Sequence, residues 1–426
     1  MEKFIENIKD LARERPLYTI ELFVQNDCYG YAHILKRYAE VDLNYQIKSV
    51  LEHSALLYDH VWKYDIVAPL PSIFTFSDYR FPFIRQFTNK ALFAIGPSIH
   101  YAKCHFSDDE LKNLRKQLGK TLLVFLPHSS WSTYIEFDIK KILSVLKNLE
   151  REFDNIMICL GWKEVLRDIE KPFIAEGYSC VTAGHIYDKN FLDRLKTIIL
   201  LSSHTVSFSY GTHIGFCIYL NKPHWVISGI NQKVNVINKI DKATAIYKPT
   251  PLSKNQVSHF LSYFKEPRDD ISKKQLELVD IIWGISHVKT KKELRELFEI
   301  TEDMYKSKYM PCDKTNPITI SQLADYIDKK ELKKAKILLE YSKKMGFSKK
   351  WIALFDAFID YCEENKIKAE KKLKMIVKTN GFIKNLAERF LTNLDNNFSL
   401  SAEILNVYPK PKFFSPFKIN LPWRLD

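Results

Sequence analysis

The chain has few glycines, widely spaced cysteines and no long apolar run. Only 12 of its 426 residues are glycine and no Ser/Pro-rich tract occurs, which argues against long disordered linkers. The seven cysteines include no CxxC pair, a pattern that argues against a zinc site or a disulfide framework and is typical of reduced thiols in a cytosolic protein. Because no run of about 18 apolar residues is present, we expect neither a signal peptide nor a membrane span.

Acidic motifs that hold a metal-bound nucleotide are missing as well. The sequence has no Asp-x-Asp triplet, and its nearest pairs, Asp108-Asp109 and Asp269-Asp270, lie where exposed helices are predicted to start. Carboxylates at such positions commonly cap helices. We therefore expect no metal ion and no cofactor. Zinc spacings, RRM-like aromatic patterns and helix-turn-helix signatures are also missing, so we expect no nucleic-acid partner.

The composition is that of a large, basic, globular protein. Hydrophobic residues make up 46% of the chain and the net charge is +13. At about 150 residues per domain, the length fits two or three domains. Residues 317–426 carry 21 basic and 13 acidic side chains, a net charge of +8. This asymmetry indicates an anionic partner.

The pattern of apolar residues divides the chain into four regions. We assign residues 1–118 to a first α/β domain, 119–290 to a second, 291–316 to a linker helix and 317–426 to a basic helical region with an aromatic tail. In the second region, the predicted strands Thr121–Leu126, Asn155–Leu160, Tyr178–Ala183 and His224–Ile227 alternate with predicted helices that include Phe137–Phe153 and Lys163–Glu176. This alternation predicts an α/β fold with a parallel sheet covered by helices on both faces.

The most informative segment is Ser203–Ile227, in which a strand or loop is followed by a polar turn and a short apolar helix. The turn comprises Ser209, Tyr210, Gly211, Thr212 and His213, and Gly215 follows within the helix. Hydroxyls and free backbone N–H groups at the start of a helix suit a phosphate or nucleotide. The alternative is an ordinary buried βαβ crossover with one polar turn, and these residues alone leave both open.

Two further polar turns follow predicted strands of the same sheet. One contains His128, Ser129 and Ser130, and the other contains Gly184 and His185. Because ligands of open parallel sheets bind beyond the carboxyl ends of the strands, we expect all three turns to face one crevice. Their hydroxyls and imidazoles suit a nucleotide phosphate better than a metal ion.

The polar turns belong to a longer series of motifs. In chain order these are Tyr29–Ala32, Glu52–Ser54, Ile95–Ala102, Leu126–Ser130, Cys159–Trp162, Gly177-Tyr178, Ala183–His185, Asp188 with Phe191-Leu192, and Ser209–Pro223. The series spans roughly residues 20–290 and resembles bacterial surface-polysaccharide glycosyltransferases of the GT-B fold, which build capsules and lipooligosaccharides. The resemblance implies a GT-B-like pair of Rossmann-type domains with an α-helical C-terminal extension.

The resemblance also implies transfer of a sugar from a nucleotide-sugar donor to a glycan or lipid-linked acceptor, without a metal. In the related sialyl- and Kdo-transferases, a His-Pro element and a Ser/Thr-rich turn bind the donor. Here the order is Pro127-His128 and the turn is Ser209–Thr212. Both a CMP-linked acid sugar and a UDP- or other NDP-linked sugar therefore stay open. Glu52, His53 or Asp59 is expected to act as the base for the acceptor hydroxyl.

The departing phosphate requires hydrogen-bond donors. The expected contacts are His213 and His128, with Thr212 and Ser129 as hydroxyl donors and Gly211 giving access to the backbone. Two other function classes stay open. One is a non-catalytic scaffold of a surface-glycan pathway that has lost its donor site, and the other is a nucleic-acid-binding protein. Nucleotide binding separates the enzyme from the scaffold.

The C-terminal region predicts consecutive amphipathic helices, similar to hairpins of the tetratricopeptide type. The predicted helices are Ser321–Ile327, Leu332–Met345, Lys350–Asn365, Lys368–Val377 and Phe382–Leu394. Their lysine pairs are either solvated helix faces or a docking surface for anionic lipid headgroups. The tail mixes Phe413, Phe414, Phe417 and Trp423 with basic residues, which fits a membrane interface or a segment packed across the domains. We expect a cytoplasmic protein, with the inner face of the cytoplasmic membrane as its peripheral location.

Overall fold

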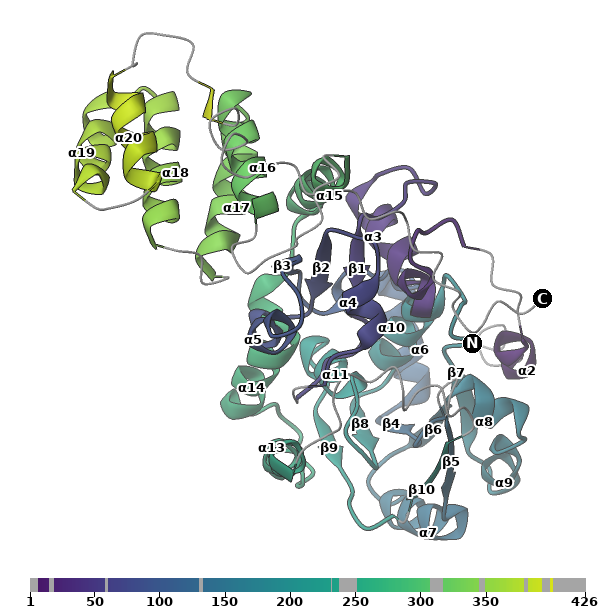
Figure 1. The fold of residues 1–426 in the computed structure, drawn as a ribbon. Coiled ribbons are helices and arrows are strands. Elements are labelled where there is room, and N and C mark those ends of the chain that lie inside the picture. The colour runs from purple at the N-terminus through teal and green to yellow at the C-terminus, as the bar shows by residue number, and fades with distance from the viewer. Residues whose placement is uncertain are drawn as a thin grey trace.

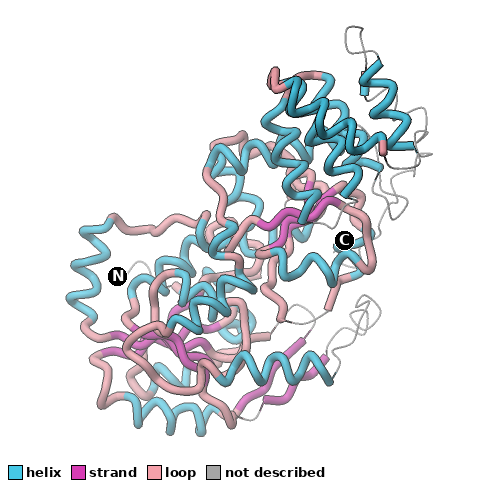
Figure 2. The backbone as a smooth tube through the Cα atoms, turned by 90° about the vertical axis from the view of Figure 1, so that its left-hand side faces the viewer, coloured by secondary structure: helices cyan, strands magenta, loops and turns pink. Residues whose placement is uncertain are grey.

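The computed structural model describes residues 7–14, 19–57, 60–129, 133–230, 232–236, 251–306, 317–344, 349–378, 382–392 and 399–400. Two parallel sheets flanked by helices form the body of the molecule, and a helical array extends from it (Figure 1). In the view turned by 90°, the array again stands to one side of the sheets (Figure 2). The predicted α/β class is confirmed.

The first sheet has three parallel strands in the order β1-β2-β3. The elements of this region are η1 (Val24–Gly30), α3 (Tyr31–Ala39), β1 (Ser49–Leu51), α4 (Lys63–Val67), β2 (Ser72–Thr75), η2 (Asp78–Arg80), α5 (Phe81–Arg85), β3 (Ala91–Ala94) and η3 (Ser98–His100). Every position of the three strands is buried, as is usual for a parallel sheet that is covered on both faces.

The second sheet has five parallel strands in the order β7-β6-β4-β8-β9. The elements are α6 (Asp108–Leu118), β4 (Thr121–Phe125), α7 (Ile139–Leu149), β6 (Asn155–Leu160), α8 (Trp162–Leu166), α9 (Glu170–Ala175), β7 (Ser179–Thr182), α10 (Phe191–Leu201), β8 (His204–Ser207), α11 (His213–Tyr219) and β9 (His224–Val226). Successive residues of β4 enter two different core clusters, with Leu122 and Val124 in one and Leu123 and Phe125 in the other. Helices therefore cover both faces of this sheet, as predicted.

Two features of the second region differ from the sequence prediction. The single helix predicted over Lys163–Glu176 is broken into α8 and α9, and Asp168 between them has a positive φ of 60°. Strands β5 (Thr133–Phe137) and β10 (Gln232–Val236) form an antiparallel pair that was not predicted.

Segments before the first sheet and after the second sheet each pack against elements of the other sheet. Helix α2 (Ile8–Ala12) packs against α8 and β7 of the second sheet, although it precedes the first. After β9, the chain continues through α13 (Pro251–Ser262), α14 (Lys273–Trp283), η4 (Ile285–His287) and α15 (Lys291–Lys306). Helix α15 lies in the predicted linker region and packs against α3.

The C-terminal array consists of five helices among the described residues. They are α16 (Pro317–Asp328), α17 (Leu332–Lys344), α18 (Lys349–Cys362), α19 (Lys366–Val377) and α20 (Phe382–Thr392). Each overlaps one predicted helix, and neighbours in sequence pack together. The aromatic tail lies outside the described residues. None of the described helices combines the length and the apolar character needed to cross a bilayer.

Candidate functional site

A cavity of about 350 Å³ lies where the carboxyl ends of the two sheets face each other. Loops that follow β1 and β3 of the first sheet and β4, β6, β7 and β8 of the second contribute to its wall. The chain starts in the middle of the second sheet at β4, winds outward through β6 and β7, and returns to the other side of β4 at β8. Ligands of doubly wound sheets bind at this reversal point.

Seven of the fourteen predicted site residues meet at this cavity. Its wall includes His53, His128, Ser129, Tyr210, Gly211, Thr212 and His213. Glu52, Gly184, His185, Ser209 and Gly215 do not contribute to the wall. Asp59 and Ser130 lie outside the described residues.

His213, the first residue of α11, lies against the wall of the cavity. Its ring stacks on Phe125 with the ring centres 4.6 Å apart, and its Nε2 is buried without a hydrogen-bond partner among the described residues. A Cβ on Gly211 would lie 2.5 Å from the imidazole, so the small size of this residue permits the ring position. Burial, together with the nearby His224 and His128, holds the pKa of His213 well below its usual range. The ring is therefore neutral near pH 7.

His224 lies next to His213, but both of its ring nitrogens lie within hydrogen-bond distance of hydroxyl groups. Its Nδ1 is 2.8 Å from the hydroxyl of Thr205 and its Nε2 is 3.1 Å from that of Ser207. Burial lowers the pKa of His224 to about 3. These bonds give His224 a structural role. Within the described ranges, no group of three or more His, Cys, Asp or Glu side chains is arranged to hold a metal ion.

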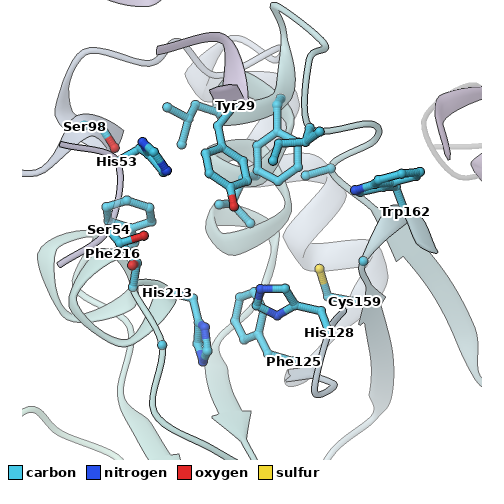
Figure 3. Close-up of a pocket in the computed structure, with 18 of the residues that line it drawn as sticks. Tyr29, His53, Ser54, Ser98, Phe125, His128, Cys159, Trp162, His213 and Phe216 are labelled. Atoms are coloured by element: carbon cyan, nitrogen blue, oxygen red, sulfur yellow. The ribbon is translucent and has the colours of Figure 1, made fainter. Parts of the chain in front are cut away.

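His53 lies two residues after β1 of the first sheet. Its ring centre lies 6.0 Å from that of Tyr29, and it lies beside Ser98 on the wall of the cavity (Figure 3). Burial lowers the pKa of His53 to about 4, against a smaller opposing contribution from the backbone of Leu51. At neutral pH the imidazole is uncharged and able to accept a proton.

Glu52 faces away from the cavity, because successive residues at the end of a strand point to opposite sides. Its Oε1 accepts a hydrogen bond of 2.8 Å from Nε of Arg80, and both side chains are buried. Arg80 also donates to the carbonyl oxygen of His60 at 2.6 Å. Burial raises the pKa of Glu52 and the Arg80 charge opposes this shift. The geometry gives Glu52 a part in an internal ion pair rather than contact with a ligand.

The polar turn after β8 of the second sheet is hydrogen-bonded to the loop after β1 of the first sheet. The hydroxyl of Tyr210 donates to the carbonyl oxygen of Ala55 at 2.5 Å, and the amide of Ala55 donates to Oγ1 of Thr212 at 3.3 Å. A hydroxyl that accepts one hydrogen bond still carries its own proton. Thr212 therefore remains able to donate into the cavity.

Ser129 is occupied by protein contacts. Its hydroxyl donates to Oε1 of Glu164 at 2.5 Å and accepts from the amide of Ile135 at 3.0 Å. Glu164 is fully buried. Because the only hydroxyl proton is used in this way, Ser129 fixes the turn that carries His128 and does not supply the hydroxyl donor that was expected.

No family model, curated protein or solved structure matches the chain.

The two predicted glycines outside the wall have packing roles. A Cβ on Gly215 would lie 2.2 Å from the indole of Trp283, and one on Gly184 would lie 2.8 Å from the guanidinium of Arg194. Both glycines therefore allow a large side chain to approach the backbone closely.

His185 and Ser209 are held by contacts within the protein. The amide of His185 donates to the carbonyl oxygen of Leu11 at 2.8 Å, and its ring centre lies 4.4 Å from that of Trp162. The carbonyl oxygen of Ser209 accepts a hydrogen bond of 3.0 Å from the hydroxyl of Ser207. These contacts hold the loops around the cavity in place.

Sequence reasoning did not assign a site role to several residues of the wall. Tyr29 and Trp162 are two of them, and Cys159 and Ser98 also contribute. The hydroxyl of Tyr29 points toward the middle of the cavity (Figure 3), and Tyr29 itself has a positive φ of 60°. All four residues lie in motifs that carry the family resemblance, so the sequence did mark them. Their positions along the chain gave no reason to expect them side by side.

The described wall of the cavity carries no Asp, Glu, Lys or Arg. Aromatic rings, hydroxyls and three imidazoles contribute to it. His53 and His213 are neutral near pH 7, because burial lowers the pKa of each. Such a surface can stack against rings, donate and accept hydrogen bonds, and take up a proton. It supplies no fixed positive charge to an anionic ligand.

Proposed function

We propose that the chain is a glycosyltransferase of GT-B type, which moves a sugar from a nucleotide-sugar donor to a surface-glycan or lipid-linked acceptor. The observation that carries the proposal is the cavity between the carboxyl ends of two parallel sheets, with histidines contributed from both sides. The strand order of the second sheet, 3-2-1-4-5 in its own numbering, is that of doubly wound nucleotide-binding sheets. The donor is either a CMP-linked acid sugar or a UDP- or other NDP-linked sugar.

In this proposal His53 is the general base. It lies on the first-domain side of the cavity, while His128 and His213 lie on the second-domain side. The neutral imidazole accepts the proton of the acceptor hydroxyl as that oxygen attacks the anomeric carbon. The bond from the anomeric carbon to the phosphate oxygen breaks in the same reaction. A negative phosphate nearby raises the pKa of a histidine, which offsets the low value that burial gives to His53 in the empty cavity.

The departing phosphate is bound by hydrogen-bond donors of the second domain. Thr212 retains its hydroxyl proton, and His213 and His128 can each donate from a ring nitrogen. An anion at this place also favours protonation of His213, which provides positive charge beside the departing phosphate. Nucleotide binding is therefore expected to be coupled to proton uptake.

The two histidine roles are separable by experiment. His213→Ala is expected to lower nucleotide affinity at least tenfold, whereas His53→Ala is expected to keep nucleotide affinity within about threefold and to lose sugar transfer. The solvent-exposed His259 on α13 provides a matched control, since His259→Ala is expected to change neither property. Calorimetry measures the affinities and circular dichroism checks the fold. Unchanged nucleotide affinity in folded His213→Ala would remove this residue from the donor site.

The non-catalytic scaffold is the second candidate function. The observation that favours it is the lack of charged side chains in the described wall of the cavity, because nucleotide phosphates usually meet Arg or Lys. A scaffold that has lost its donor site would bind none of the nucleotides at millimolar concentration. The enzyme would bind one of them.

A further inference from the structure

Helix α19 exposes two large apolar side chains to solvent. Ile367 is 88% exposed and Met375 is 65% exposed, more than any other large hydrophobic side chain among the described residues. Helix α19 lies at the outer edge of the C-terminal array (Figure 1). Its contacts with other elements are mainly to α18 and α20. The two apolar side chains therefore lie on an outer surface and do not belong to the core of the array.

The exposed apolar residues share one face of the helix with lysines. At about 100° of rotation per residue, one arc of about 100° contains Ile367, Lys371, Lys374, Met375 and Lys378. We call these five residues the α19 face. The buried residues Ala369, Leu373 and Ile376 lie on the opposite side of the helix. The α19 face thus combines apolar and cationic side chains and contains no acidic one.

The lysines of α19 fall into two groups. Lys368 and Lys372, on the flank toward α18, form ion pairs with Asp360, and Lys372 also pairs with Asp356. These pairs hold α19 against α18. Within the α19 face, Lys374 pairs with Glu370 of the same helix at 3.0 Å. No salt bridge to Lys371 or Lys378 is found within the described part of the chain, so their charges are available to an external anion.

We propose that the α19 face docks the protein on an anionic lipid bilayer. Charge complementarity selects this occupant, because the face is wholly cationic in its charged residues and belongs to a region with a net charge of +8. An acidic protein would also attract lysines. The bilayer additionally accommodates Ile367 and Met375, which project from a convex helix surface and can enter the boundary between headgroups and acyl chains. Lysines in this arrangement lay their aliphatic stems along the apolar layer and place their ammonium groups among the lipid phosphates.

The proposal is tested by vesicle flotation with the full chain. Vesicles of phosphatidylcholine with one-third phosphatidylglycerol are compared with vesicles of phosphatidylcholine alone, at about 100 mM salt, where screening is moderate. The wild type is expected to float with the anionic vesicles only. Lys371→Gln with Lys378→Gln is expected to weaken binding about 25-fold, since each lysine near an anionic surface contributes roughly fivefold. Ile367→Ser with Met375→Ser is expected to weaken it at least tenfold.

A second lysine pair in the same array controls for net charge. Lys349 and Lys350 are exposed at the start of α18 and lie outside the α19 face, so Lys349→Gln with Lys350→Gln makes the same charge change elsewhere. This variant is expected to weaken binding by threefold or less. Equal losses for the two lysine pairs would overturn the proposal, and so would unchanged binding of the Ile367 and Met375 variant. Failure of the wild type to bind anionic vesicles would also overturn it. This is the result expected if the α19 face binds an acidic protein instead.

Discussion

Gly215→Ala is expected to destabilise the protein because the residue packs against a buried indole. A Cβ at this position would lie 2.2 Å from Cδ2 and 2.3 Å from Cε2 of Trp283, whereas carbon atoms in contact are normally about 3.5–4 Å apart. Trp283 is completely buried and cannot turn into solvent. Either the indole or helix α11 must therefore move by more than about 1 Å.

The size of the effect follows from two contributions. Inserting a methyl group into a packed core costs about 1–3 kcal/mol. Nε1 of Trp283 donates to the carbonyl oxygen of Thr212 at 3.0 Å, and loss of such a bond costs about 0.5–1.5 kcal/mol. We therefore expect the free energy of unfolding to fall by about 1.5–4.5 kcal/mol.

Urea unfolding followed by circular dichroism measures this change. The control is a double-mutant cycle with Trp283→Leu, which removes the ring that the new methyl group strikes. The alanine is expected to cost at least about 1 kcal/mol less in the Trp283→Leu background than in the wild type. An unchanged urea midpoint for Gly215→Ala, together with reduced nucleotide affinity, would refute the packing role and return Gly215 to the phosphate site.

Three further predictions concern buried polar groups. Glu52→Gln breaks the buried ion pair with Arg80 and is expected to lower the free energy of unfolding by about 3 kcal/mol. The activity of the folded protein is expected to be unchanged. A stable but inactive variant would show instead that Glu52 is the base. The pKa values of about 4 for His53 and about 3 for His224 lie below the unfolded value of about 6.5, so their stabilising contribution is complete above pH 6.5 and is lost as the pH falls toward 3–4. The urea midpoint should therefore decrease as the pH is lowered from 7.5 to 5. This dependence on pH is expected to be weaker in His53→Gln than in the wild type. An equal dependence in both proteins would contradict the lowered pKa of His53. Tyr210→Phe removes the 2.5 Å hydrogen bond to the carbonyl oxygen of Ala55 and is expected to lower the free energy of unfolding in urea by about 1 kcal/mol. An unchanged midpoint would show that the bond contributes nothing.

The sequence was sufficient to predict the parts of the fold that local patterns determine. Strand β6 was predicted at its observed bounds, and β4 differs from its prediction by one residue, because buried parallel strands appear as continuous apolar runs. The break between α8 and α9 was missed, since the apolar spacing continues through Asp168 while its backbone turns to a positive φ. The pairing of β5 with β10 was missed because about one hundred residues separate partners that no local signal connects.

The candidate site also combines residues that sequence patterns indicate with residues that only long-range contacts bring together. All three histidines of the wall meet at the cavity. His128 and His213 were selected because they lie in polar turns after predicted strands, whereas His53 was selected from the family resemblance. Glu52 was selected on the same grounds, but it lies one residue earlier than His53 and points to the other side. Tyr29 lies in η1 and Trp162 in α8, more than one hundred residues apart, and only the tertiary structure brings them to one wall.

The measurement that tests the central claim most directly is calorimetric titration of the wild-type protein with CMP, UDP, GDP and TDP, repeated with His213→Ala. The account predicts that one nucleotide binds the wild type, that its affinity falls at least tenfold in the folded variant, and that binding takes up protons, so that the measured enthalpy depends on the buffer. Binding of none of the four at millimolar concentration would contradict the glycosyltransferase proposal and favour the scaffold.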